Sequence, residues 1–132
     1  MATTFVSART IADEDGQWLY FFVEQDAFGS FTPFTWSVDA AQKRVEVSQT
    51  KNLRRLRITP AGFGLTLTGA VTLRLSTADA TGDEFQFLYV PNAPIAVTRD
   101  GQPATGTYDA QGHTFLVVET DAALHEWVIT FP

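Results

Sequence analysis

The stretch Leu65-Thr66-Leu67-Thr68-Gly69-Ala70-Val71-Thr72-Leu73-Arg74-Leu75 has the strongest period-two pattern in the chain. Leucine or valine stands at positions 65, 67, 71, 73 and 75, and threonine, alanine or arginine stands at the positions between them. Because successive side chains of a strand point to opposite faces, the pattern predicts a half-buried strand. Gly69 interrupts the apolar row, which predicts a bulge or bend there. Such a strand needs a second apolar layer to cover its buried row.

Similar strand-like segments recur about every ten residues, separated by turns rich in Gly, Pro, Asn and Asp. They include residues 3–10, 17–24, 34–38, 43–48, 55–58, 84–90, 95–99, 113–120 and 124–131. The dipeptide Asp100-Gly101 favours a type I′ hairpin, because both central residues of that turn need φ > 0. We therefore expect an all-β fold, a single antiparallel β-sandwich of jelly-roll type with roughly 9–11 strands, forming one domain over residues 1–132.

The composition of the chain limits the function classes to which it can belong. Its 132 residues suffice for one domain, and 11 Phe, 3 Tyr and 3 Trp supply a large core. The absence of cysteine excludes disulfides, cysteine-based zinc sites and thiol nucleophiles. The net charge of −6 argues against nucleic acid and anionic membranes as partners. The N-terminus lacks a signal-peptide pattern and no apolar run reaches the roughly 18 residues of a membrane span, so we expect a cytoplasmic location by default.

The sequence contains little that points to catalysis or to a transition metal. None of its serines stands in a Gly-x-Ser-x-Gly motif, and its two histidines form no metal-ligand pair of known spacing. A catalytic triad could still assemble in space. Glycoside hydrolysis needs only two carboxylates at a suitable separation. The candidates are Glu24, Glu46, Glu84, Glu119 and Glu126. We expect Glu46 and Glu119 to face outward from their strands, and no pair is brought together by the sequence pattern.

Two acidic turns are candidate calcium sites. One contains Asp13 and Asp15, and the other contains Asp79 and Asp83. Carboxylate oxygens in a loop are the ligands that Ca²⁺ prefers, although neither turn has the EF-hand spacing. The alternative is that both are ordinary solvated turns, in which case the chain needs no cofactor.

Basic residues are concentrated in one part of this acidic chain. Six of the nine fall within fifteen positions: Lys43, Arg44, Lys51, Arg54, Arg55 and Arg57. In a hairpin they would share one two-stranded ribbon. Arginine suits carboxylates and phosphates, so we expect Arg55 and Arg57 to hold an acidic group of a ligand or partner. The alternative is that these charges protect an exposed sheet edge from strand addition.

Aromatic residues are concentrated between Trp18 and Trp36, where eight of the seventeen lie within nineteen positions. Trp18, Tyr20 and Trp36 are candidates for stacking against sugar rings, and core packing is the competing interpretation. The segment 17–24 is apolar on both predicted faces, so it is also a candidate subunit interface in a homo-oligomer.

Residues 95–131 resemble a known kind of module. The residues that carry the resemblance are Ile95-Ala-Val-Thr-Arg-Asp-Gly-Gln-Pro, Tyr108-Asp-Ala-Gln-Gly-His-Thr-Phe-Leu-Val-Val and His125-Glu-Trp-Val-Ile. This arrangement is similar to the closing hairpins of the C-terminal accessory β-sandwich domains of glycoside hydrolases and polysaccharide lyases. The resemblance implies a non-catalytic module that packs on a carbohydrate-active enzyme or positions it. It implies no catalytic residue in this chain.

The sequence thus leaves three hypotheses for function. The first is a non-catalytic carbohydrate-associated module that binds glycan or serves a larger enzyme as an accessory domain. The second is a structural or assembly protein that forms homo-oligomers through the segment 17–24. The third is a small β-sandwich glycosidase or lyase. Hairpin pairing would also set Arg55 and Arg57 beside the polar face of the stretch 65–75, which makes that face a candidate site wall.

Overall fold

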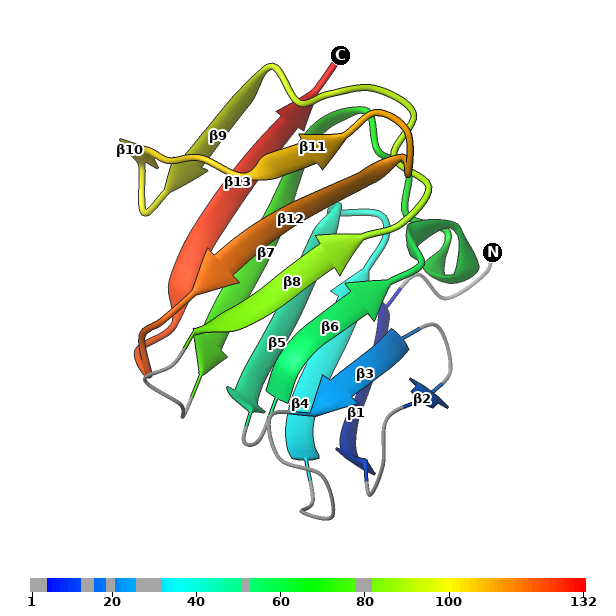
Figure 1. Cartoon of the computed structure of the whole chain (residues 1–132), viewed down its shortest axis with the longest axis vertical. Coiled ribbons are helices and arrows are strands. Elements are labelled where there is room, and N and C mark those ends of the chain that lie inside the picture. Colours follow the sequence, from blue (N-terminus) through cyan, green and yellow to red (C-terminus); the bar gives the residue numbers. More distant parts are fainter. Residues whose placement is uncertain (1–4, 13–15, 19–20, 26–31, 51–52, 78–81) are drawn as a thin grey trace.

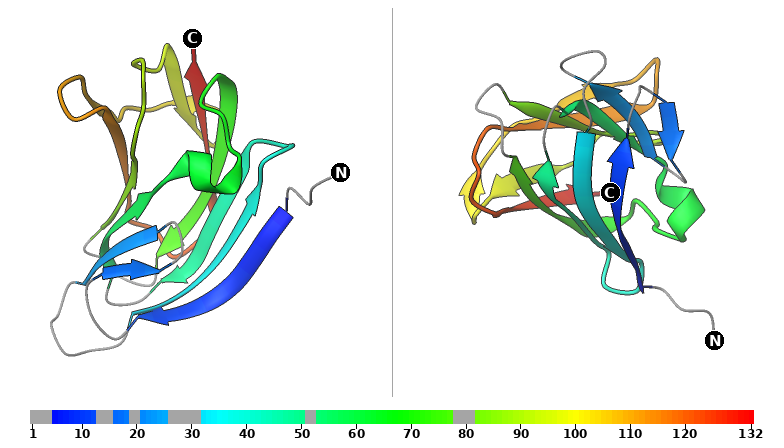
Figure 2. Two further views of the ribbon diagram at one scale, coloured as in Figure 1. Left: turned by 90° about the vertical axis from the view of Figure 1, so that its right-hand side faces the viewer. Right: turned by 90° about the horizontal axis from the view of Figure 1, so that it is seen from below.

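The computed structural model describes the chain except for residues 1–4, 13–15, 19–20, 26–31, 51–52 and 78–81. The described residues form two β-sheets that lie face to face as a sandwich (Figure 1). Figure 2 shows the sheets as two separate layers. The all-β sandwich predicted from the sequence is therefore confirmed.

Each sheet has a mixed strand order. The seven-stranded sheet contains, in spatial order, β1 (Phe5–Ala12), β4 (Thr32–Asp39), β5 (Arg44–Thr50), β7 (Gly69–Thr77), β13 (His125–Phe131), β9 (Ala96–Arg99) and β10 (Gln102–Pro103). The six-stranded sheet contains β11 (Thr107–Asp109), β12 (Thr114–Glu119), β8 (Asp83–Phe87), β6 (Leu53–Ile58), β3 (Phe21–Gln25) and β2 (Gly16–Trp18). The helical content of the described residues is the 3-10 turn η1 (Pro60–Phe63), and none of their helices is long and apolar enough to cross a membrane.

The sheets are not purely antiparallel as predicted, because β5 pairs with β7 and β6 pairs with β8 in parallel. From β5 to β8 the chain changes sheet at every connection and reverses its direction each time (Figure 1). Two strands in the same sheet that are separated by one strand of the other sheet must then run in the same direction. The described residues contain 13 strands, some of only two or three residues, against the 9–11 expected.

The period-two stretch forms β7 only from Gly69 onward. Gly69 has φ +66 and marks the start of the strand rather than a bulge within it. Val71, Leu73 and Leu75 are buried, so the predicted inward row is confirmed for this part. The buried row packs in the apolar core with residues of the opposite sheet such as Leu56.

The neighbours of β7 differ from those expected. It pairs with β5 and β13, whereas β6, which carries Arg55 and Arg57, lies in the opposite sheet. The predicted site wall, in which these arginines lie beside the polar face of the stretch 65–75, is therefore wrong. The shared basic ribbon is wrong for the same reason, because Arg44 lies on β5 in the other sheet. β5 and β6 lie in different sheets and therefore do not form a hairpin.

The segment 17–24 is two strands and not one. Its first part belongs to β2 and its second part to β3, and the two pair antiparallel with Gln17 opposite Phe22 and Trp18 opposite Phe21. A continuous strand with two apolar faces does not exist here, so the proposed subunit interface loses the geometry on which it was based.

The C-terminal hairpins form as predicted. Asp100 and Gly101 have φ angles of 51° and 80° and join β9 to β10, as a type I′ turn requires. The second turn joins β11 to β12, where the Asp109 carboxylate accepts hydrogen bonds from the backbone N–H groups of Gln111 and Gly112. Together with β13 these hairpins build the end of the sandwich that holds the candidate site.

Candidate functional site

The two sheets leave an opening beside the first residue of β11. β11 pairs only with the first three residues of β12, from Thr114 to Leu116, whereas β12 continues to Glu119. Within the described residues, no strand lies beside Val117 and its successors on that edge. The chain crosses from β10 in one sheet to β11 in the other through residues 104–106, which we call the strap. The strap and the uncovered edge of β12 frame the opening.

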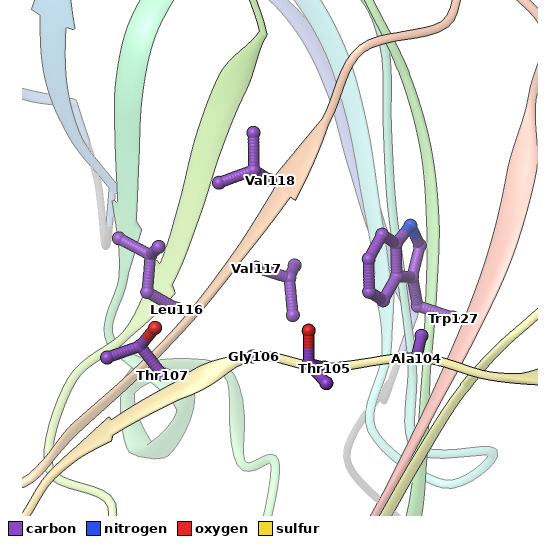
Figure 3. Close-up of a pocket in the computed structure, with 8 residues that line it drawn as sticks. All are labelled: Ala104, Thr105, Gly106, Thr107, Leu116, Val117, Val118 and Trp127. Atoms are coloured by element: carbon purple, nitrogen blue, oxygen red, sulfur yellow. The ribbon is translucent and has the colours of Figure 1, made fainter.

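A cavity of about 450 Å³ occupies this opening (Figure 3). The residues that line it are Ala104, Thr105, Gly106, Thr107, Leu116, Val117, Val118 and Trp127. Figure 3 shows the strap crossing one end, the β12 residues on one wall and the Trp127 ring on the other. None of these lining residues carries a charge. The cavity therefore combines apolar walls with threonine hydroxyls and backbone groups.

The strap is held on both sides. The backbone N–H of Ala104 donates to the carbonyl of Val97 at 3.0 Å. A Cβ on Gly106 would collide with the Phe115 ring and would lie 2.8 Å from the carbonyl oxygen of Leu116. Glycine is required here because the backbone lies directly against Phe115. The strap is consequently a fixed bridge between the sheets.

A buried carboxylate holds Trp127 in place. Glu119 is 1% exposed, and its Oε1 accepts a hydrogen bond from Trp127 Nε1 at 2.9 Å. Arg99 donates to both carboxylate oxygens, from Nε at 3.1 Å and from Nη2 at 2.8 Å, and lies 5.9 Å from the centre of the Trp127 ring. The backbone N–H groups of Thr120 and Asp121 donate to Oε2. Burial alone would raise the pKa of Glu119, but these hydrogen bonds outweigh it and lower the pKa.

The position of Glu119 corrects the sequence interpretation, which placed it on an outward face. It follows Phe115 and Val117 in the inward row of β12. The alternation of the strand contains this information, but a carboxylate in an inward row is unfavourable until its partners are known. Trp127 is likewise one of an inward row with Ile129 and Phe131, and the sequence does not show that its ring borders a cavity.

A second charged cluster lies next to this network. His125 Nδ1 is 2.5 Å from Asp100 Oδ2, and His125 Nε2 is 3.0 Å from Asp121 Oδ2. The hydrogen bond with Asp100, followed by that with Asp121, raises the pKa of His125. The pKa of Asp100 is lowered, first by the backbone N–H of Glu126 and then by His125. The pKa of Asp121 is lowered, first by the backbone N–H of Ala123 and then by His125. The cluster ties the β9–β10 turn to the start of β13.

The predicted stacking residues do not form a shared surface. Trp36 is 4% exposed and packs against Phe63 with ring centres 5.6 Å apart, so its assignment as a sugar platform is corrected to a core role. Trp18 lies on the edge strand β2, of which only the backbone is described. Tyr20 lies outside the described residues.

The predicted ligand-binding arginines already have carboxylate partners in their own sheet. Arg57 Nη2 lies 2.9 Å from Glu24 Oε1, and Arg55 Nη2 lies 3.2 Å from Glu84 Oε1. Cross-strand register sets Arg55 opposite both acids, Glu24 on β3 and Glu84 on β8. An acidic ligand would have to compete with these acids. The arrangement therefore favours an ion-pair ladder on the outer face of this sheet.

The calcium candidates fall mostly outside the described residues, which exclude Asp13, Asp15 and Asp79. Asp83 is described and buried, and its Oδ2 accepts a hydrogen bond from Thr50 Oγ1 at 2.6 Å. Among the residues that the structure describes, no group of three or more His, Cys, Asp or Glu side chains is placed to hold a metal ion. Asp83 therefore serves as a buried tie between the end of β5 and the start of β8.

Comparisons of this chain with protein-family models, with curated protein sequences and with solved structures find no match. The candidate site consequently rests on its own geometry.

Replacing Gly106 with alanine should destabilise the fold. The new methyl group must displace either Phe115 or the strap, and such overpacking costs about 1–3 kcal/mol. Chemical denaturation of the variant measures the loss. Gly112→Ala is the matched control, because its nearest neighbour is a carboxylate oxygen of the exposed Asp109 side chain and not an aromatic ring of the core. Equal stability of the two variants would contradict the tight contact.

Glu119→Gln should lower the free energy of unfolding by about 1–3 kcal/mol, because the amide leaves the Arg99 charge without its anion and presents only one accepting oxygen. Glu126→Gln is the control, since Glu126 is half exposed and lies 3.9 Å from Arg74. Denaturation and Trp fluorescence should both change in Glu119→Gln alone. A stable variant with an unchanged Trp127 signal would contradict the role of Glu119.

The His125 cluster should stabilise the protein over a limited pH range. Because the pKa of His125 is raised, its contribution to stability is lost as the pH rises through that pKa. Because the pKa values of Asp100 and Asp121 are lowered, their contribution is lost as the pH falls through those values. The contribution is therefore largest between about pH 4 and pH 6.5. His125→Gln should cost more stability near pH 5.5 than near pH 9, with His113→Asn as the control for loss of a histidine. An equal loss of stability at both pH values would contradict the stabilising role of the His125 cluster.

Proposed function

We propose that this chain is a non-catalytic β-sandwich module that binds neutral carbohydrate in the cavity beside the strap. The observation that carries the proposal is the uncharged cavity of about 450 Å³ with Trp127 fixed in its wall. Small-molecule sites typically have about 300–1,000 Å³ of concave, largely apolar space with a few polar groups. The volume of this cavity falls in that range, and its exposed lining is more polar than apolar, as a hydroxyl-rich ligand requires.

The lining chemistry favours a sugar without charged groups. Thr105 and Thr107 supply hydroxyls, and the uncovered edge of β12 supplies backbone polar groups beside Val117. The exposed apolar side chain of Val118 suits the C–H face of a pyranose ring. Trp127 is 4% exposed, so it supports the cavity wall from the core side and does not offer its ring face as a platform. An anionic group would find no cation among the lining residues.

The rigidity of the wall supports binding as well. The indole N–H of Trp127 is engaged by Glu119, and Arg99 covers the ring. A side chain that is already fixed loses little conformational entropy when a ligand arrives, so more of the contact energy appears as affinity. The same holds for the strap, which is fixed by Val97 and Phe115.

The ionised state of Glu119 favours a binding function over glycoside hydrolysis. A glycosidase needs a carboxylic acid with a raised pKa to protonate the leaving oxygen. Glu119 is the carboxylate nearest in sequence to the cavity wall of β12, yet its pKa is lowered and its oxygens accept five hydrogen bonds. Such a group is held as an anion and keeps no proton to donate.

The resemblance of residues 95–131 to accessory domains of carbohydrate-active enzymes agrees with this proposal. Every residue that lines the cavity falls within this range. An accessory role would place the module next to a larger enzyme, with the cavity binding the polysaccharide on which that enzyme acts.

Val118→Lys tests the proposal, because it places a bulky cation at the rim of a cavity suited to a neutral ligand. Affinity electrophoresis in gels of neutral polysaccharides, including xylan, glucan and mannan, should retard the native chain, and the variant should bind about tenfold more weakly. Leu124→Lys is the control, because Leu124 is equally an exposed apolar residue but does not line the cavity. No retardation of the native chain, or equal retardation of Val118→Lys, would overturn the proposal.

A further inference from the structure

We propose that a second cavity on the other side of the strap is a further subsite for the same ligand, so that a linear neutral oligosaccharide crosses the strap and contacts both cavities. This inference rests on the proposed function and defines its ligand as a chain rather than a single sugar. It is carried by the position of the second cavity, by its lining and by the shape of the strap.

The second cavity has a volume of about 350 Å³. It is bordered by the loop residues 93–95, by the first residues of β9, by Tyr108 and Phe115, and by the strap. All three strap residues, from Ala104 to Gly106, line both cavities. The two cavities are therefore direct neighbours separated by one stretch of backbone.

Strand register shows that the cavities extend in opposite directions from the strap. The first contains Trp127, near the start of β13. The second contains Ala96 and Val97, which pair with Thr130 and Ile129 near the end of β13. Three residues of a strand span about 10 Å, a distance that a short oligosaccharide covers. The loop that precedes β9 lies at the end of β13 where the C-terminus is marked, as Figure 1 shows.

The second cavity resembles the first in its lack of charge and has a more apolar lining. None of its lining residues is charged. Ile95 is 70% exposed at its rim, which leaves a large apolar side chain open to a ligand. The Tyr108 hydroxyl donates to the carbonyl of Val90 at 3.3 Å, so this ring is held in position. Apolar surface with hydroxyls at its border again suits a neutral sugar.

The strap forms a low ridge between the cavities. Its side chains are a methyl group, the exposed hydroxyl-bearing side chain of Thr105, and the hydrogen of Gly106. Because Thr105 lines both cavities, its hydroxyl is placed to hydrogen-bond a sugar on either side. The strap is fixed at Ala104 and Gly106, so it remains beneath the ligand and does not open as a lid.

The inference is tested by measuring how affinity depends on the length of the oligosaccharide. Calorimetric titration compares cellobiose with cellohexaose and maltose with maltohexaose, on the native chain, on Ile95→Asp and on Leu124→Asp. For the sugar series that binds, the hexasaccharide should bind the native chain about tenfold more tightly than the disaccharide. Ile95→Asp should remove this advantage and leave disaccharide affinity unchanged, because Ile95 lines only the second cavity. Leu124→Asp should retain it.

The outcomes separate the two proposals. If the disaccharide binds, and the hexasaccharide binds no more tightly or is insensitive to Ile95→Asp, the second subsite is overturned while the proposed function stands. If no oligosaccharide binds the native chain in titration, the second subsite is overturned, and if in addition no neutral polysaccharide retards the chain in the gel, both proposals are overturned.

Discussion

The open end of the sandwich depends on one buried anion. Glu119 stands in an inward row of β12, where an ionised carboxylate is strongly unfavourable unless hydrogen bonds and a counter-charge compensate it. Its partners come from three places along the chain: Arg99 at the end of β9, Trp127 on β13, and the N–H groups that follow β12. Satisfying this carboxylate brings these segments together. The position of the Trp127 ring, and with it the cavity wall, follows from that requirement.

The His125 cluster extends the same arrangement toward the surface. Asp100 belongs to the turn after Arg99, and Asp121 donates its backbone N–H to Glu119. The histidine therefore joins the two segments that already hold the buried anion, one through the Arg99 side chain and the other through the backbone N–H groups of Thr120 and Asp121. Charges at this end of the molecule serve to position apolar and hydroxyl-bearing walls, and they do not enter the cavity itself. This separation is what a site for a neutral ligand requires, because a charge in the cavity would hold water that the ligand must displace.

The strap is the second constraint at this end. It closes one side of the sandwich by carrying the chain from β10 to β11, and its contact with Phe115 requires glycine at position 106. Because β11 is short, the strap leaves β12 partly uncovered and creates space on both of its sides. A longer β11 would have covered that edge and extended the ladder. The cavities thus result from the late start of β11, at Thr107, and from a strap that cannot collapse onto the core.

Local patterns in the sequence were sufficient for the fold class and for several details. Alternation identified the inward residues Val71, Leu73 and Leu75, and the Asp100-Gly101 dipeptide identified its hairpin, because both depend on interactions within a few residues. The segment 17–24 shows the limit of such patterns, since the paired strands β2 and β3 leave the same continuous apolar run in the sequence as one strand would. Which sheet each strand joins was decided only by tertiary structure.

The candidate site could not be predicted from the sequence, because it too depends on which strands lie side by side. Arg55 and Arg57 looked available to a ligand until strand register set Glu24 and Glu84 beside them, and Trp36 looked like a platform until it proved to be in the core. The cavity is formed by residues that are individually unremarkable, such as Thr105, and becomes a site only through the strap. The sequence by itself determined an all-β chain with a large aromatic core and no cysteine chemistry. Tertiary structure decided which charges are paired and where the sheets part, because those properties depend on contacts between residues far apart in the chain.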